Sequence, residues 1–316
     1  MWLDVVGVVG SLAVLAVSGD QFVVALARIA GSLRIRPTVA AALVGGLGTS
    51  IAELIVAGVA ARTSPALAVG SVVGSVVANV CLALAIAALV VPLKVDSATV
   101  RREAPFSVAA VGLFALMCIG GLTTEKSAAM IPMLVAVVAG LLILARRDAA
   151  RGRDDVLGTE LAAFASTATR QSPFEIARAA VTLLLMLGGA ELMVTSSVGV
   201  AKHLGVSQGF AGLTLVGIGT SAPLVAASIQ AARRSEEALV VGNVLGGNLF
   251  IALGGGAIVG LVAGGRAASA GALPLGLMFG VVLLSWLAMA RGGKLVRVEA
   301  LLLLLAYVLT LPFVSH

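Results

Sequence analysis

The chain has 316 residues, of which 60% are hydrophobic and only 11% charged, and its mean hydropathy is +1.13. A soluble domain carries roughly 25% charged residues, so this composition excludes a soluble enzyme, a coiled coil and a disordered chain. The net charge of +6 does not indicate nucleic-acid binding in so apolar a chain. The composition predicts a polytopic membrane protein.

Ten apolar segments are long enough to cross a bilayer. They cover residues 3–27, 38–61, 66–91, 104–122, 127–145, 174–200, 208–232, 237–263, 269–290 and 297–314. Lipid offers no partners to unpaired backbone groups, so each segment is expected to be a helix. We therefore predict an all-α polytopic membrane protein with ten transmembrane helices. The first segment lacks a basic stretch and a small-residue cleavage site, so it is expected to remain as a span.

The basic residues predict the orientation of these helices. With the N-terminus outside, 17 of the 21 Lys and Arg residues fall on the inner side. The other four, on the outer side, are Arg62, Lys126, Lys202 and Arg266. Cytoplasmic loops of membrane proteins carry such an excess of cations. We therefore expect a multi-pass protein of the cell membrane with both termini extracytoplasmic.

The one long polar stretch divides the chain. It spans residues 146–173, mixes acidic and basic residues, and ends in a Ser-Pro pair. We predict a cytoplasmic linker there, between a five-helix repeat at 1–145 and a second five-helix repeat at 174–316.

The two predicted halves contain matching motifs. The sequence LGTS at 47–50 corresponds to IGTS at 218–221, and a second glycine motif follows each at a similar distance. Five helices is an odd number, so the second copy would cross the membrane inverted. Inverted repeats are typical of secondary transporters. Small residues are also favoured wherever membrane helices pack closely, so a chance match is the alternative.

The motifs resemble a known family. The first copy reads GLGTSIAE at 46–53 and GSVVGSVVAN at 70–79. The second reads GIGTSAPL at 217–224 and GNVLGGNLFI at 242–251. These segments resemble the alpha repeats of the calcium/cation antiporter superfamily, which includes the sodium/calcium exchangers, with a degenerate second repeat. The resemblance implies a secondary antiporter of inorganic cations working by alternating access, and no enzyme activity.

The second copy departs from the family pattern. Family members usually have a glutamate in each repeat, but this chain has Glu53 in the first and Leu224 in the second. The positions that match Ser75 and Asn79 are occupied by residues without side-chain oxygens, Gly247 and Ile251. The resemblance therefore supports the architecture more strongly than the usual ion stoichiometry.

The polar residues of the motifs predict a cation site. Thr49 and Glu53 are four residues apart and share a helix face, as do Ser75 and Asn79. Carboxylate, amide and hydroxyl oxygens suit hard cations such as Ca²⁺ or Na⁺. We expect Glu53 to be the central ligand and the proton acceptor, with Thr49 and Thr220 also on the metal. The full predicted set is Glu53, Thr49, Ser50, Ser75, Asn79, Thr220 and Ser221.

Four further polar residues are secondary candidates. Asp20 and Glu191 correspond in the two halves and lie nearer helix ends, so we expect interfacial or gating roles for them. Asn243 and Asn248 belong to the second glycine motif. Asn248 is free to point away from the site, because its counterpart in the first repeat is Val76.

A single carboxylate constrains the chemistry. It leaves a bound Ca²⁺ with net positive charge, so we expect weaker Ca²⁺ binding than at a two-carboxylate site, and a better fit to a monovalent cation or one that competes with a proton. The expected partners are inorganic cations and the lipid bilayer, with no cofactor beyond the transported ion. Other readings remain open: transport of an organic cation or metabolite through the apolar second half, a non-transporting membrane subunit, or a Glu53 that is protonated and structural.

Overall fold

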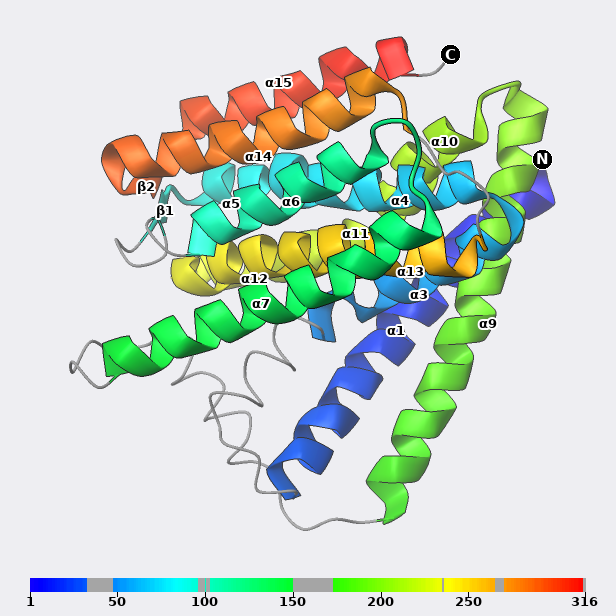
Figure 1. The fold of residues 1–316 in the computed structure, drawn as a ribbon, viewed down its shortest axis with the longest axis horizontal. Helices are drawn as coiled ribbons and strands as arrows, with labels where there is room; N and C mark the ends of the chain where they lie inside the picture. The colour runs from blue at the N-terminus through cyan, green and yellow to red at the C-terminus, as the bar shows by residue number, and fades with distance from the viewer. Residues whose placement is uncertain are drawn as a thin grey trace.

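The computed structural model describes residues 1–32, 48–95, 100, 103–149, 173–234, 236–264 and 270–314. In these ranges the first half forms α1 (Trp2–Ser32), α3 (Gly48–Thr63), α4 (Pro65–Ala78), the π-helical turn η2 (Asn79–Leu84), α5 (Ala85–Val90), α6 (Ala104–Cys118) and α7 (Thr124–Ala149). The second half forms α9 (Pro173–Leu204), α10 (Gln208–Ala211), η4 (Gly212–Val216), α11 (Gly217–Arg233), α12 (Glu237–Leu249), η5 (Phe250–Gly255), α13 (Gly256–Val262), α14 (Ala272–Gly292) and α15 (Arg297–Val314). Figure 1 shows this helical assembly.

Each of the ten predicted spans coincides with a helix or with a run of consecutive helices, which confirms the all-α polytopic fold. Residues 38–47 of the second span and 150–172 of the predicted linker lie outside the described residues. The fourth span ends earlier than expected, at Cys118, because Gly120 and Gly121 follow with φ of 70° and 94°. Positive φ is outside the right-handed helical region, so the helix stops there. The domain boundaries stay a prediction.

Seven described stretches are long and apolar enough to cross a membrane. They are Trp2–Leu26, Pro65–Val90, Thr124–Leu141, Phe174–Leu204, Gln208–Arg233, Glu237–Val262 and Ala272–Gly292. The stretches at Pro65–Val90 and Glu237–Val262 are the most deeply buried of these and form the centre of the molecule. The outer helices α1, α7 and α9 expose large apolar side chains instead, as lipid-facing helices do. The protein is therefore a multi-pass membrane protein.

Contacts between the halves show that the two repeats are inverted. The long helices α1 and α9 lie side by side and antiparallel (Figure 1). Gly7 of α1 lies beside Ser196 of α9, and Leu15, further along α1, lies beside Gly189, which is earlier in α9. Helix α3 instead runs parallel to α12 and α13, with Ser50 beside Gly247 and, two turns later, Gly58 beside Ile258. Helix α12 is the equivalent of α4, and α4 follows α3 as the next span, so α4 runs opposite to α3. Helices α4 and α12 therefore cross the membrane in opposite senses, as the equivalent helices α1 and α9 do.

Glycines bring α4 and the helix run α10–η4–α11 into backbone contact. A Cβ atom added to Gly217 would lie 2.6 Å from the Cα of Gly74, and one added to Gly74 would overlap the carbonyl group of Leu213. A residue with a side chain does not fit at either position. Small residues of this kind let membrane helices approach closely. Side chains that follow these glycines are therefore held at the contact between α4 and this helix run.

A two-stranded sheet joins two loops at one end of the molecule. Strands β1 (Leu93–Lys94) and β2 (Lys294–Leu295) pair antiparallel, and the backbone N–H of Val95 donates to the carbonyl of Gly293 at 2.8 Å. The side chain of Arg297 donates to the carbonyl of Leu89 at 3.0 Å, near the C-terminal end of α5. A cation at this end of a helix also interacts favourably with the helix dipole. The strand pair and the Arg297 contact hold α5 and α6 against α14 and α15.

Candidate functional site

Helix α3 carries the predicted central carboxylate. Ser50 and Glu53 are three residues apart, so they share a face of the helix. Their exposed fractions are 1% and 5%. Among the described residues, Oε2 of Glu53 is buried and has no hydrogen-bond partner. Thr49 lies in the first turn of the same helix, but its side chain is outside the described part.

Helix α4 positions Ser75 and Asn79 one turn apart. The helix starts at Ser64, whose hydroxyl accepts a hydrogen bond from the backbone N–H of Leu67, and Pro65 occupies the first turn. This is a favoured arrangement of an N-cap and a following proline. Ser75 and Asn79 are buried, and Asn79 begins the π-helical turn η2. π-Helical turns within α-helices frequently mark functional sites.

The second half brings Thr220 and Ser221 to the same region. Both residues lie near the start of α11 and both are buried. The hydroxyl oxygens of Thr220 and Ser75 are 3.2 Å apart, although the residues are 145 positions apart in the chain. Thr220 also donates to the carbonyl of Val216 at 2.9 Å. Two predicted site residues, one from each repeat, therefore meet at the interface between the repeats.

Asn248 also faces this interface, instead of pointing away. The side-chain Nδ2 of Asn79 donates to Oδ1 of Asn248 at 3.1 Å. One residue earlier in α12, the carbonyl of Gly247 accepts from the hydroxyl of Ser50 at 3.4 Å. The sequence gives no clear signal of this pairing, because the counterpart of Asn248 in the first repeat is apolar and Gly247 contributes through its backbone.

We call the set Ser50, Glu53, Ser75, Asn79, Thr220, Ser221 and Asn248 the polar cluster. Four of its buried polar atoms have no hydrogen-bond partner among the described residues. They are Oε2 of Glu53, Oδ1 of Asn79, Oγ of Ser221 and Nδ2 of Asn248, which come from four different stretches of helix. Leaving a buried polar group unpaired costs about 1–3 kcal/mol, and more for a charged one. Three of the four are oxygens, the donor atoms that hard cations prefer. These three oxygens are chemically suited to bind a cation.

The second repeat contributes apolar side chains where the first contributes oxygens. Leu224, the counterpart of Glu53, is 8% exposed, and Ile251, the counterpart of Asn79, is 1% exposed. A Cβ atom on Gly247, the counterpart of Ser75, would lie 3.2 Å from Oγ of Ser50 and 3.9 Å from Nδ2 of Asn79. Gly247 thus lies within the cluster without adding a side chain to it.

The other secondary candidates lie outside this buried cluster. Asp20 on α1 and Glu191 on α9 are exposed, and Asn243 on α12 is partly exposed. Within the described ranges, no group of three or more His, Cys, Asp or Glu residues is arranged to hold a metal ion. Cys81 and Cys118 are free and buried.

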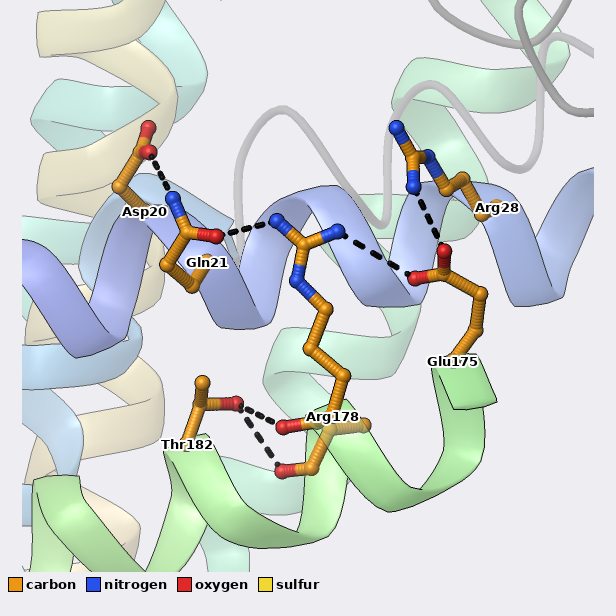
Figure 2. Close-up of polar contacts among 7 residues, drawn as sticks. Asp20, Gln21, Arg28, Glu175, Arg178 and Thr182 are labelled. Carbon is orange, nitrogen blue, oxygen red and sulfur yellow. Dashed lines mark hydrogen bonds and ion pairs between the residues drawn. The ribbon is translucent and has the colours of Figure 1, made fainter. Parts of the chain in front are cut away.

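A polar network near Asp20 joins α1 to α9, and we did not anticipate it from the sequence. Figure 2 shows the guanidinium of Arg178 between Gln21 and Glu175, with Arg28 bonded to the other oxygen of Glu175. The distance from Nη1 of Arg28 to Oε1 of Glu175 is 2.6 Å. Gln21 also donates to Asp20 at 3.2 Å. Opposite charges on two antiparallel helices are the signal that could have revealed it.

Known proteins share this sequence pattern and this fold. A family model described as sodium/calcium exchanger protein matches residues 3–145 and 174–315. CaxA of Alkalimonas amylolytica, named as a candidate antiporter, is 30% identical over 316 residues, 98% of this chain and 97% of CaxA. The sodium/calcium exchanger MaX1 of Methanosarcina acetivorans is 43% identical over 82 residues, 26% of this chain and 21% of MaX1.

Solved structures agree with the family match at the level of the fold. The sodium-calcium exchanger NCX_Mj, soaked with 2.5 mM Na⁺ and 1 mM Sr²⁺, superposes with a TM-score of 0.65 at 24% identity, covering 98% of each chain. The family model accounts for both halves of the sequence, and the two halves supply the facing polar side chains of the buried cluster. The chain belongs to the sodium/calcium exchanger family.

Proposed function

We propose that the protein is a secondary antiporter of inorganic cations, in which Glu53 is the central ligand. The cargo would be Ca²⁺ or Na⁺, exchanged against Na⁺ or H⁺. Ser50, Ser75, Asn79, Thr220 and Ser221 would supply further oxygens, and Thr49 completes the set predicted from the sequence. The observation that supports this most directly is the buried Glu53 carboxylate, whose Oε2 lacks a partner among the described residues.

A buried carboxylate without a counter-charge needs a proton or a cation. An acidic side chain inside a membrane costs about 2.5–3.5 kcal/mol on insertion scales, so such residues are kept where they serve a function. Among the described residues, Asp4 and Glu175 lie in ion pairs, whereas Glu53 lies in none. The negative charge of Glu53 must be neutralised, and two different cations can do this in turn. This supports exchange of one cation for another rather than one-way transport.

The inverted halves support an alternating-access mechanism. In transporters of this type the substrate site lies at the interface between the repeats, near the middle of the membrane. The contacts between Ser75 and Thr220 and between Asn79 and Asn248 both cross that interface. Rocking one half against the other would therefore open the same site to either side of the membrane.

Reconstituted protein tests the role of Glu53. We expect Glu53→Gln to abolish cation-driven flux in proteoliposomes, because the amide keeps the shape of the side chain and removes its charge. Glu125→Gln is the matched control, since Glu125 is exposed at the start of α7. Unchanged flux in Glu53→Gln, with the protein still folded, would contradict the proposed role.

An organic cation or metabolite is the second candidate cargo. The buried Leu224 and Ile251 make part of the site apolar, as ligand pockets for organic molecules usually are. Thermal unfolding in detergent distinguishes the two. Stabilisation by Na⁺ or Ca²⁺ supports inorganic cargo, and stabilisation by organic cations alone supports the second candidate. A folded protein that responds to neither, and carries neither, would be a non-transporting subunit.

A further inference from the structure

The polar cluster contains a single carboxyl group, that of Glu53. Of the carboxylates in the described ranges, only Glu53 and Glu175 are buried. Glu175 lies at the far end of α9 between Arg28 and Arg178, so its charge is already compensated (Figure 2). Asp20 and Glu191 are exposed. Glu53 is therefore the charge that a bound cation would meet.

Comparison of the two repeats shows how the second half avoids adding a charge. The first repeat presents Glu53 and Asn79, and the second presents Leu224 and Ile251 at the equivalent positions. All four side chains are buried. Leu224 and Ile251 offer no oxygen, so beyond Thr220 and Ser221 the second half must use other positions to contribute polar groups to the site.

Asn248 occupies that role in the structure. It lies on α12 one turn before Ile251, and it is completely buried. Its amide bonds to the amide of Asn79 across the repeat interface at 3.1 Å. Gly247 beside it has no side chain, which leaves room for this pairing next to Ser50.

The amide pair is neutral whichever way the two amides are turned. One N–H group donates to one carbonyl oxygen, which leaves one oxygen and one NH₂ group without a partner; here these are Oδ1 of Asn79 and Nδ2 of Asn248. The free oxygen can bind a cation, whereas the free NH₂ group is a hydrogen-bond donor and repels it. An aspartate has nearly the same shape as an asparagine, so replacing one NH₂ group by oxygen would double the charge of the site.

We propose that the site is matched to one positive charge, and that Asn248 sets this specificity by pairing with Asn79 in place of a second carboxylate. The favoured cargo is a monovalent inorganic cation such as Na⁺, and Ca²⁺ is disfavoured. A divalent ion held by Glu53 alone would keep a net positive charge in a low-dielectric site, where electrostatic interactions are strong. This inference rests on the proposed function and narrows its substrate.

Isotope uptake into proteoliposomes tests the inference. We expect the wild-type protein to carry ²²Na⁺ and to take up ⁴⁵Ca²⁺ at least about tenfold more weakly, judged by the concentration for half-maximal uptake. Asn248→Asp adds a carboxylate with almost no change of shape, so half-maximal Ca²⁺ uptake should move to at least about tenfold lower concentration. Gln230→Glu is the matched control, because it makes the same amide-to-acid change at an exposed position on α11.

The outcomes separate this inference from the proposed function. Wild-type uptake of Ca²⁺ with an affinity equal to that for Na⁺ overturns the inference and leaves cation antiport standing. Absence of both fluxes in folded wild-type protein overturns both. If Asn248→Asp does not fold, Leu224→Glu supplies the second carboxylate from the facing helix. A folded Asn248→Asp or Leu224→Glu protein without tighter Ca²⁺ binding shows that charge at this interface does not set the specificity.

Discussion

At the scale of single residues, glycines determine how closely the two halves approach. Gly74 and Gly217 lie where any Cβ atom would meet the backbone of the opposite helix. Each also precedes a site residue within the same helix, Ser75 in one half and Thr220 in the other. The hydroxyl contact at 3.2 Å between those residues therefore depends on the missing side chains.

Substitution of Gly74 by alanine should destabilise the protein by at least about 2 kcal/mol, because overpacking displaces backbone that has no flexible side chain to move. Thermal unfolding in detergent measures this. Gly276→Ala is the control: its Cβ atom meets nothing within 4 Å among the described residues, so we expect a change below about 1 kcal/mol. Equal effects of both substitutions would show that the close contact is not required.

Most residues of the candidate site could be named from the sequence, but their pairing could not. The spacing within each motif indicates which side chains share a helix face, as it does for Ser75 and Asn79. It does not indicate which atoms meet across 169 positions of chain, as Asn79 and Asn248 do. That contact depends on the rotation of α12 about its axis and on the space left by Gly247, which are properties of packing.

At the scale of helices, α1 and α9 are joined at both ends by polar contacts. Near one end, Asp4 lies 3.4 Å from Nδ1 of His203. Near the other, the network of Figure 2 connects Arg28, Glu175 and Arg178. The sequence indicated Arg28 and Arg178 only as topology signals, because the antiparallel contact of α1 and α9 determines their partners.

Removing one member of this network should leave a buried charge only partly compensated. We expect Arg178→Ala to destabilise the protein by about 2 kcal/mol, because Glu175 is only 8% exposed and loses one of its two cationic neighbours. Adding Glu175→Gln to the same protein should recover part of that loss, since the incompletely compensated carboxylate is then gone. Thermal unfolding measures both, and Arg291→Ala, at an exposed position, is the control. Additive effects of the two substitutions would contradict this coupling.

At the scale of the whole molecule, the odd number of spans in each half produces the inverted arrangement. Hydropathy predicted the ten spans well, since each requires only length and apolar composition. The ends of the helices were less predictable, as at Cys118, where glycines and not a change in hydropathy stop α6. The strand pair β1–β2 was not predicted, because two-residue strands leave no pattern in a sequence.

The distribution of Lys and Arg residues predicts which face of the molecule is extracytoplasmic. We expect a cysteine at Lys202 to react with a membrane-impermeant maleimide in intact cells, and a cysteine at Arg234 to react only after the membrane is opened. Both positions are exposed, and the single span Gln208–Arg233 separates them. Cys81 and Cys118 are buried and should remain unlabelled, which makes the unsubstituted protein the control. The reverse labelling pattern would place the N-terminus inside.

The turns η2 and η5 have a consequence for helical phase. Each is a π-helical segment, in which hydrogen bonds span one residue more than in an α-helix. The faces of α5 and α13 are therefore rotated relative to the faces of α4 and α12 that precede them. Counting in steps of three or four from Asn79 or Asn248 therefore fails to identify the residues beyond Leu84 or Gly255 that share their helix face. A metal ligand introduced beyond either π-helical turn must be placed by the helix face observed after that turn.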